Sequence, residues 1–273
     1  NDVPLRKDPP RRRCRPDAER AASRAREDRG ARGTRRENGR MDAVKGMFYA
    51  VGVGPGDPMW MTREACGVLE ACPVIAAPQT ASGEMLALSI AQGAAELGGK
   101  TVLPLSFAMS RDAAVRAAGY AHAADAIAPE LDAGRDVAMV NLGDVSIYAT
   151  AYYVLDELRR RGYDTRMVPG VASFSAVAAA LGRSLTEMEL PLHIYPAGAS
   201  DLDAALAQPG TKVLMKTGKQ MKTVKEQIKA SGSEAMMIQN CGMPDEQIYR
   251  TVDEIPEDAG YYSLIIVKEE KKP

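Results

Sequence analysis

The chain has 273 residues, of which 45% are hydrophobic and 26% are charged. These are ordinary values for a globular protein with a sizeable core, and the length suits two α/β domains. The longest apolar runs, such as residues 261–267, are far shorter than the roughly 20 residues of a membrane-spanning helix, so we exclude a membrane protein.

The four cysteines and two histidines exclude further classes of protein. No CxxC pair is present, and His122 lies far from His193, so neither a zinc site nor a disulfide framework is expected. We therefore predict no metal site and a reducing, cytoplasmic location. The lack of a Cys/His nucleophile pair also argues against a covalent hydrolase.

The net charge of −1 hides an asymmetry along the chain. Residues 1–46 carry 15 Lys and Arg against 8 Asp and Glu, a net +7, whereas the remaining residues carry a net −8. The first segment is rich in Arg, Pro and Gly and lacks periodic apolar positions, so we predict a disordered basic extension without a function. A nucleic-acid arm and a transit peptide are the alternatives. The acidic residues argue against a transit peptide, and the negative remainder argues against nucleic-acid binding.

From residue 47 onward, strand-like and helix-like patterns alternate. The apolar run 48–53 predicts a strand that ends in a turn rich in Gly and Pro, and Thr62 is a suitable N-cap for a helix through Leu69. Further strands are predicted at residues 74–77, 101–105, 136–142 and 163–168, with helices at 84–97, 112–131 and 148–161 between them. Such continuous apolar strands favour a parallel sheet that is covered by helices on both faces.

The C-terminal part continues the pattern with shorter elements. Helices are predicted at residues 173–181, 202–207 and 221–229, and strands at 193–195, 212–215, 235–239, 247–251 and 262–267. The last three strands are separated by short connections, which favours antiparallel pairing. We therefore predict an α/β fold with an N-terminal domain over residues 47–147 and a C-terminal α/β domain with a mixed sheet over residues 148–270.

Three turns that contain glycine follow apolar strands, at residues 52–58 (GVGPGDP), 142–148 (LGDVSIY) and 168–173 (VPGVAS). Ligands of open parallel sheets bind at the carboxyl ends of the strands, so these turns are expected to converge on one site. Taken alone, each is more typical of a structural turn. The first turn is not a dinucleotide fingerprint, because GxGxxG requires glycine where Asp57 stands, and no Gly-Lys-Ser/Thr phosphate loop follows.

In order and spacing, the three turns resemble those of the tetrapyrrole methylase family. The family's GxGPGDP turn matches residues 52–58, its GDPxxY turn matches 143–148 with Val145 in place of the usual proline, and its VPGxSS-like turn matches 168–173. Residues 213–219 (VLMKTGK), 239–242 (QNCG) and 261–268 (YYSLIIVK) are similar to the branch that methylates C-20 of precorrin-2 or its cobalt-bearing form. The resemblance spans about residues 47–270.

The resemblance implies a fold, a cofactor and a reaction. Family members have two α/β domains with S-adenosyl-L-methionine bound in the cleft between them, and the implied function is C-20 methylation in cobalamin biosynthesis. Members are usually homodimers, so a homodimer is expected. Methylation at another corrin carbon is the alternative within the family, and a nucleotide-dependent oxidoreductase is the alternative from another class.

The resemblance also assigns the cofactor contacts residue by residue. From the three turns these are Pro55, Leu142, Gly143, Asp144, Ile147, Ala172 and Ser173. Thr217 and Cys241 complete the set from later strands, and both differ from the commoner family residues. The carboxylate of Asp144 can accept from the ribose hydroxyls or the α-amino group of the cofactor, and its structural alternative is a turn residue that caps a helix.

The expected tetrapyrrole substrate carries many carboxylates, which Arg or Lys side chains would bind. Lys216 and Lys219 flank a glycine at the end of a strand and are predicted to bind substrate, the ordinary alternative being a solvated surface lysine. A proton must also leave C-20 after methyl addition, so a base is needed. The candidates are Tyr148, Asp112, His122 and Glu187, and the sequence leaves the choice among them open.

Overall fold

The computed structural model describes residues 44–110, 112–187, 189–197 and 201–269. The described chain divides into two compact units that are not contiguous in sequence. The first comprises residues up to 51 together with 61–140 and 150–168, and the second comprises residues 52–60, 141–149 and 169 onward. The predicted extension over residues 1–46 lies outside the described residues, except for residues 44–46.

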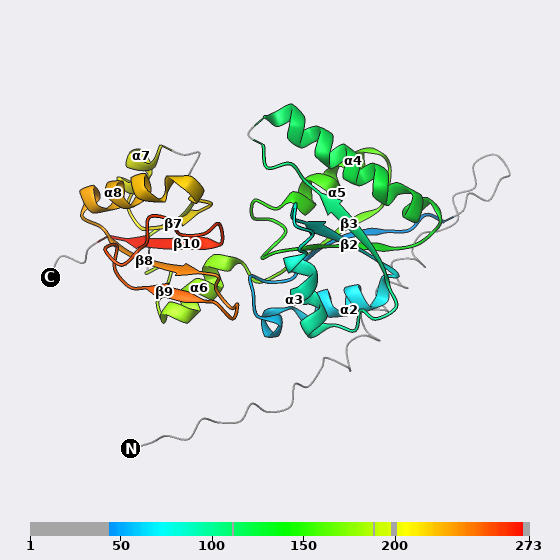
Figure 1. The fold of residues 1–273 in the computed structure, drawn as a ribbon, viewed down its shortest axis with the longest axis horizontal. Coiled ribbons are helices and arrows are strands. Elements are labelled where there is room, and N and C mark those ends of the chain that lie inside the picture. Colours follow the sequence, from blue (N-terminus) through cyan, green and yellow to red (C-terminus); the bar gives the residue numbers. More distant parts are fainter. Residues whose placement is uncertain (1–43, 111, 188, 198–200, 270–273) are drawn as a thin grey trace, which may run out of the picture. The chain divides into compact units, whose positions relative to one another are not determined.

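The first unit is a parallel sheet with helices on both faces. Its strand order is β3-β2-β4-β1-β5, where β1 pairs in parallel with β5, and β2 pairs in parallel with β3 and β4. Helices α2 and α3 cover one face, and α4 and α5 cover the other (Figure 1). The strands are β1 (Phe48–Gly52), β2 (Val74–Gln79), β3 (Thr101–Ser106), β4 (Val137–Asn141) and β5 (Thr165–Val168). The helices are α2 (Arg63–Ala71), α3 (Leu86–Ala94), α4 (Ala113–Asp132) and α5 (Thr150–Arg160).

Local capping explains where helix α2 begins and ends. The hydroxyl of Thr62 accepts a hydrogen bond from the Ala65 amide at 3.1 Å, which confirms the predicted N-cap. At the other end, the Lys100 ammonium donates to the carbonyls of Glu70 and Cys72, each at 2.7 Å. These bonds satisfy carbonyl groups that have no partner within the last turn of the helix.

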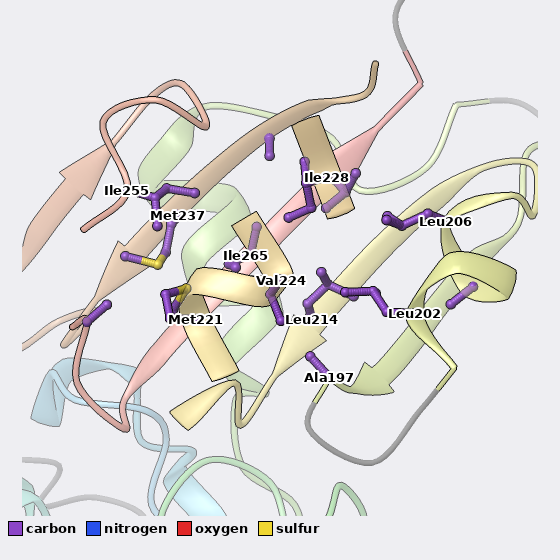
Figure 2. Packing of buried hydrophobic residues seen from close by; sticks show 14 residues of the cluster. Ala197, Leu202, Leu206, Leu214, Met221, Val224, Ile228, Met237, Ile255 and Ile265 are labelled. Carbon is purple, nitrogen blue, oxygen red and sulfur yellow. The ribbon is translucent and has the colours of Figure 1, made fainter. Parts of the chain in front are cut away.

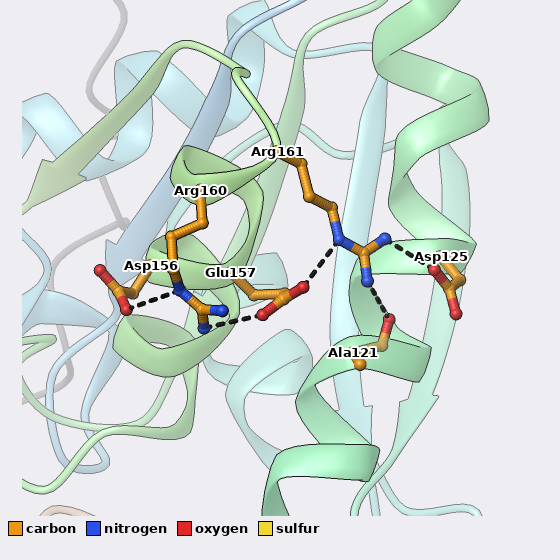
Figure 3. A network of polar contacts seen from close by, with 6 residues as sticks. All are labelled: Ala121, Asp125, Asp156, Glu157, Arg160 and Arg161. Carbon is orange, nitrogen blue, oxygen red and sulfur yellow. Dashed lines mark hydrogen bonds and ion pairs between the residues drawn. The ribbon is translucent and has the colours of Figure 1, made fainter.

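A network of charged side chains joins α5 to α4 (Figure 3). The Arg161 guanidinium, just after α5, donates to Glu157 at 2.8 Å, to Asp125 of α4 at 2.6 Å and to the Ala121 carbonyl at 3.3 Å. Asp125 is exposed, so we assign this network a modest contribution to stability.

The last residues of the predicted extension, Lys45 and Gly46, contact the first unit. The Gly46 amide donates to the Leu131 carbonyl at 2.7 Å, and the Lys45 ammonium lies 3.2 Å from Asp132 and 4.5 Å from the Tyr163 ring centroid. Residues 45 and 46 therefore belong to the folded first unit, because their partners on α4 and near β5 are distant in sequence.

The second unit is a mixed sheet of strand order β6-β7-β10-β8-β9. Strand β6 is parallel to β7, whereas β10 is antiparallel to both β7 and β8, and β9 is antiparallel to β8. This confirms the antiparallel pairing predicted for the last three strands. The strands are β6 (Leu192–Pro196), β7 (Thr211–Met215), β8 (Glu234–Gln239), β9 (Gln247–Tyr249) and β10 (Ser263–Lys268). The helical segments are η1 (Pro58–Trp60), α6 (Ser173–Leu181), α7 (Leu202–Leu206), η2 (Gly218–Gln220) and α8 (Met221–Ser231).

Two apolar layers hold this second sheet between its helices. Helices α7 and α8 cover one face and α6 covers the other (Figure 1). Leu214 of β7 packs with Met221, Val224 and Ile228 of α8 on the first face (Figure 2), whereas Val213, the preceding residue, packs on the α6 face. Successive side chains of a strand point to opposite faces of the sheet, which explains why Val213 and Leu214 pack on different sides. Each such fully buried side chain stabilises the fold by about 1.5–3 kcal/mol.

The units group the chain differently from the predicted boundary between residues 147 and 148. Helix α5 and strand β5 belong to the first unit, where Phe48 to Val51 of β1 pair with Thr165 to Val168 of β5. Conversely, the turns after β1 and β4 belong to the second unit. Long-range strand pairing determines this grouping, and a boundary placed along the sequence does not capture it.

Candidate functional site

The three glycine turns predicted to converge do meet, within the second unit. Gly54 and Gly143 form an antiparallel bridge in which the Gly143 amide donates to the Gly54 carbonyl at 2.8 Å and the Gly54 amide returns a bond at 3.2 Å. The Gly170 amide donates to Oδ2 of Asp144 at 2.9 Å. The turns follow the neighbouring strands β4, β1 and β5, and this strand order explains why they come together.

Glycine is required at two of these positions by the close approach of backbones. A Cβ added at Gly52 would lie 2.6 Å from the Gly170 nitrogen and 2.7 Å from the Gly143 oxygen. A Cβ added at Gly170 would lie 2.3 Å from the same oxygen. Such contacts are shorter than atoms tolerate, so any larger side chain would separate the turns.

Asp144 fastens the second turn to the third. Its Oδ1 accepts from the Ser146 amide at 2.8 Å and from the Ser146 hydroxyl, while Oδ2 accepts from Gly170. Burial alone would raise the pKa of this carboxyl, but the hydrogen bonds from Ser146, Gly170 and Val145 outweigh it and lower the pKa. Asp144 therefore remains ionised at neutral pH. Its turn-forming role is observed, and it leaves lone pairs of the carboxylate for a further donor.

The first turn also meets the loop after β8. A Cβ at Gly56 would lie 2.3 Å from the Cys241 carbonyl oxygen, and one at Gly242 would lie 2.4 Å from the Trp60 ring. Pro55 is buried beside this contact. Two predicted cofactor residues from opposite ends of the chain, Pro55 and Cys241, are thus brought to the same edge of the second sheet.

Strands β7 and β8 end at this edge, on either side of the start of β10. Met215 pairs with Leu264 of β10, and Gln239 pairs with Ser263, so the residues that follow, Thr217 and Cys241, lie near the start of the same strand. This register explains why two predicted cofactor residues from separate strands share one edge.

The side chain of Thr217 has an unusual environment. Only 2% of the residue is exposed, and its hydroxyl has no hydrogen-bond partner among the described residues. A buried hydroxyl without a partner carries a desolvation penalty, and such groups are uncommon in folded proteins. The hydroxyl of Thr217 is therefore available to a ligand.

Cys241 is buried, and its thiol is unreactive at neutral pH. Burial raises the pKa of its thiol to about 12, and the nearby Glu246 carboxylate adds to this effect. The protonated thiol is neither a nucleophile nor a metal ligand at neutral pH. In addition, no group of three or more His, Cys, Asp or Glu side chains among the described residues could hold a metal ion.

The remaining predicted cofactor residues border the second and third turns. Leu142 and Ile147 are half-buried, and the Leu142 carbonyl accepts from the Asn141 side chain at 2.8 Å. Ala172 is the N-cap of α6 and offers no side-chain cap, so Ser173 opens a helix whose first amides lack that partner. The sequence analysis did not identify Asn141. Its side-chain amide also donates to the Asp144 carbonyl at 3.4 Å and so stabilises the second turn.

Of the two lysines predicted to bind substrate, Lys216 contacts the second turn. The Lys216 ammonium donates to the Tyr148 carbonyl at 3.0 Å and lies 5.4 Å from the centre of the Tyr148 ring. Lys219 lies in η2, and its side chain falls outside the described part of the structure. The structure thus joins one of the two lysines to the second turn.

The four candidate proton acceptors are divided between the two units, two in each. Tyr148 contacts Lys216, whereas Asp112 caps the N-terminus of α4 and His122 is exposed on that helix in the first unit. Glu187 lies 3.3 Å from the Lys268 ammonium in an ion pair. Of the two candidates in the second unit, Tyr148 and Glu187, Tyr148 is the one that lies at the edge where the turns meet.

Comparison with known proteins gives a consistent result. Residues 47–256 match the family described as Tetrapyrrole (Corrin/Porphyrin) Methylases. The chain is 30% identical to the cobalt-precorrin-2 C(20)-methyltransferase of Salmonella typhimurium over 83% of this chain and 98% of that protein. It is 31% identical to the probable cobalt-precorrin-2 C(20)-methyltransferase of Methanocaldococcus jannaschii, over 85% and 100% of the two chains.

A solved structure shares the fold. The uroporphyrin-III C-methyl transferase of Thermus thermophilus, complexed with S-adenyl homocysteine, superposes with a TM-score of 0.59 at 20% identity and covers 82% of this chain and 98% of its own. Among the described helices, none combines the length and the apolar character that crossing a membrane requires.

Proposed function

Because the chain belongs to the tetrapyrrole (corrin/porphyrin) methylases, we propose that it methylates C-20 of precorrin-2 or its cobalt-bearing form, with S-adenosylmethionine as the methyl donor, in cobalamin biosynthesis. Two relatives named for C-20 methylation, aligned over nearly their whole lengths, support this position over other corrin carbons. The alternative of a nucleotide-dependent oxidoreductase lacks support, since the first turn carries Asp57 where a dinucleotide fingerprint needs glycine.

One structural observation carries the cofactor assignment. Three glycine turns meet at the sheet edge that also holds the buried, unpartnered hydroxyl of Thr217. The donor set suits S-adenosylmethionine, because it combines closely approaching backbone, a carboxylate at Asp144 and a hydroxyl in need of a partner. We therefore assign cofactor binding to Pro55, Leu142, Gly143, Asp144, Ile147, Ala172, Ser173, Thr217 and Cys241.

The chain's own residues act in this reaction by binding and alignment. S-adenosylmethionine supplies an electrophilic methyl group when it is bound. Transfer of that group to a carbon nucleophile is an in-line displacement, so orientation and exclusion of water are the protein's main contributions. The rigid turn contacts at Gly143 and Gly170 orient the site, and the protonated thiol of Cys241 cannot compete for the methyl group.

The first experiment tests the cofactor and the reaction together. Binding of S-adenosylmethionine at about 100 times its Kd should stabilise the protein by about 2.7 kcal/mol, whereas NAD should leave the melting temperature unchanged. Incubation with S-adenosylmethionine and either precorrin-2 or its cobalt-bearing form, followed by mass spectrometry and NMR, locates the new methyl group. A product methylated at a carbon other than C-20 would contradict the proposed position of methylation.

Thr217→Val separates the cofactor role of the hydroxyl from its structural role. The isosteric change removes a buried polar group, so the free protein should be as stable as the wild type or more stable. Loss of one hydrogen bond of about 0.5–1.5 kcal/mol should weaken S-adenosylmethionine binding by about two- to twelvefold in calorimetry. Thr223→Val, at an exposed position of α8, is the matched control. An unchanged dissociation constant would remove the Thr217 hydroxyl from the site.

We also propose that the protein acts in the cytoplasm as a homodimer. The cysteine usage supports the compartment, since no CxxC pair is present and no disulfide joins any of the described residues Cys66, Cys72 and Cys241. Light scattering after gel filtration tests the oligomeric state, and a mass corresponding to one chain of 29.3 kDa would contradict the dimer.

A further inference from the structure

Two bulky residues at the candidate site have a left-handed backbone. Tyr148 has φ of 49° and Lys216 has φ of 56°, a conformation that side chains other than Gly, Asn and Asp rarely adopt. Strained backbone of this kind persists where the surrounding structure enforces it, and it is concentrated at functional sites. The observation motivates a search for what holds these two residues and what they present.

Tyr148 and Lys216 hold each other although 68 positions separate them in sequence. The Lys216 ammonium donates to the Tyr148 carbonyl at 3.0 Å and lies 5.4 Å from the ring centroid, within the range of a cation–π contact. The Tyr148 hydroxyl in turn donates to the Ile194 carbonyl of β6 at 3.1 Å. Tyr148 is thus anchored to the sheet at its hydroxyl and contacts the lysine through its carbonyl and its ring.

Lys216 has no anionic partner among the described residues, unlike other lysines of the second unit. Four other lysines each have the ammonium nitrogen no more than 3.8 Å from a carboxylate oxygen, namely Lys212, Lys222, Lys229 and Lys268. The Lys216 ammonium is instead held against an aromatic ring and a carbonyl. A cation in this state has hydrogen-bonding capacity left for an incoming anion.

We propose that Tyr148 is a positioning residue that holds the Lys216 ammonium ready to bind a carboxylate of the tetrapyrrole substrate. This inference rests on the proposed function and adds Tyr148 to it. Pre-positioning the cation reduces the entropy lost when the substrate binds, which explains why the fold retains two strained residues here. The adjacent Thr217 places the lysine next to the assigned cofactor residues, where a substrate carbon must approach.

The protonation of Lys216 supplies a readout that a purely structural role would not affect. Although the residue as a whole is exposed, partial burial of its ammonium lowers the pKa of Lys216. Tyr148 is the titratable side chain that the described contacts place against it, and burial raises the pKa of Tyr148, which therefore stays neutral. Substrate affinity should fall as pH rises through the lowered pKa of Lys216.

The test measures binding of the tetrapyrrole by absorbance titration, independently of turnover, together with KM, kcat and the Kd for S-adenosylmethionine. Lys216→Met should weaken tetrapyrrole binding about 10- to 100-fold, as expected for a lost hydrogen bond to a charged group, and should leave the cofactor Kd within about twofold. Lys216→Arg should restore most of the affinity and abolish its decline at alkaline pH. Lys222→Met removes an exposed lysine of α8 and is the matched control with unchanged binding.

Tyr148→Gly tests the positioning role, since glycine accepts the positive φ and therefore preserves the turn. It should weaken tetrapyrrole binding about three- to tenfold and move the alkaline decline to higher pH, because the freed ammonium regains water. Tyr148→Phe keeps the ring and carbonyl but loses the bond to Ile194, and it should have a smaller effect.

Three results would overturn the inference. Tetrapyrrole binding that is unaffected by Lys216→Met would remove the lysine from the substrate site, and a weakened cofactor Kd with normal tetrapyrrole binding would assign its charge to the cofactor instead. If tetrapyrrole affinity declined at the same alkaline pH in the wild type and in Tyr148→Gly, the positioning role would be rejected. Failure of the wild type to methylate C-20 would refute the proposed function, while the binding titration would still test Lys216.

Discussion

Gly170→Ala should disrupt the junction of the three turns. The added methyl group would lie 2.3 Å from the Gly143 oxygen and 2.8 and 2.9 Å from backbone carbons of Gly52. All three atoms belong to the backbone, so no flexible side chain can move aside. Overpacking costs about 1–3 kcal/mol, and strain on the bond from the Gly170 amide to Asp144 adds to it, so we expect a loss of about 2–4 kcal/mol in unfolding free energy.

Urea denaturation and calorimetric titration with S-adenosylmethionine measure the two consequences of this substitution. The displaced turns should lose cofactor affinity by at least tenfold under conditions where the variant is still folded. Gly98→Ala is the matched control, because a Cβ there meets nothing within 4 Å, and it should change stability by less than about 1 kcal/mol. A Gly170→Ala protein with wild-type stability and affinity would refute the claim that close backbone packing of the turns builds the site.

Two other substitutions test charged groups. Lys212 is almost fully buried, and its ammonium lies 3.8 Å from the half-exposed Glu269. Because the cost of burying this charge exceeds the gain from the ion pair, Lys212→Met should raise the unfolding free energy by about 1 kcal/mol in urea denaturation. A fall of that size would show that the ion pair is stabilising. Asp144 has a lowered pKa in the folded state, so its stabilising effect is present above the unfolded value of 3.8 and is lost as pH falls through the folded value. The stability difference between wild type and Asp144→Asn should therefore stay constant above about pH 5 and shrink as the pH falls below 3.8, and a difference that stays constant into this acid range would contradict the ionised role.

Local signals in the sequence placed several elements well. The predicted helix at residues 173–181 coincides with α6, and the predicted N-cap Thr62 starts α2. These successes have a local cause, because caps and apolar periodicity act within a few residues. The helix predicted from residue 148 instead begins at Thr150, since Tyr148 adopts positive φ in its contact with Lys216.

The glycine turns and the family motifs could be recognised from the amino-acid sequence alone, because tight turns require specific residues at adjacent positions. Tertiary structure decided which of those residues meet. The bond from Gly170 to Asp144, the packing of Gly56 on Cys241 and the contact of Lys216 with Tyr148 all join segments that are distant in sequence. Such contacts depend on the order of strands in the sheets, and long-range pairing of backbones sets this order where no local pattern records it.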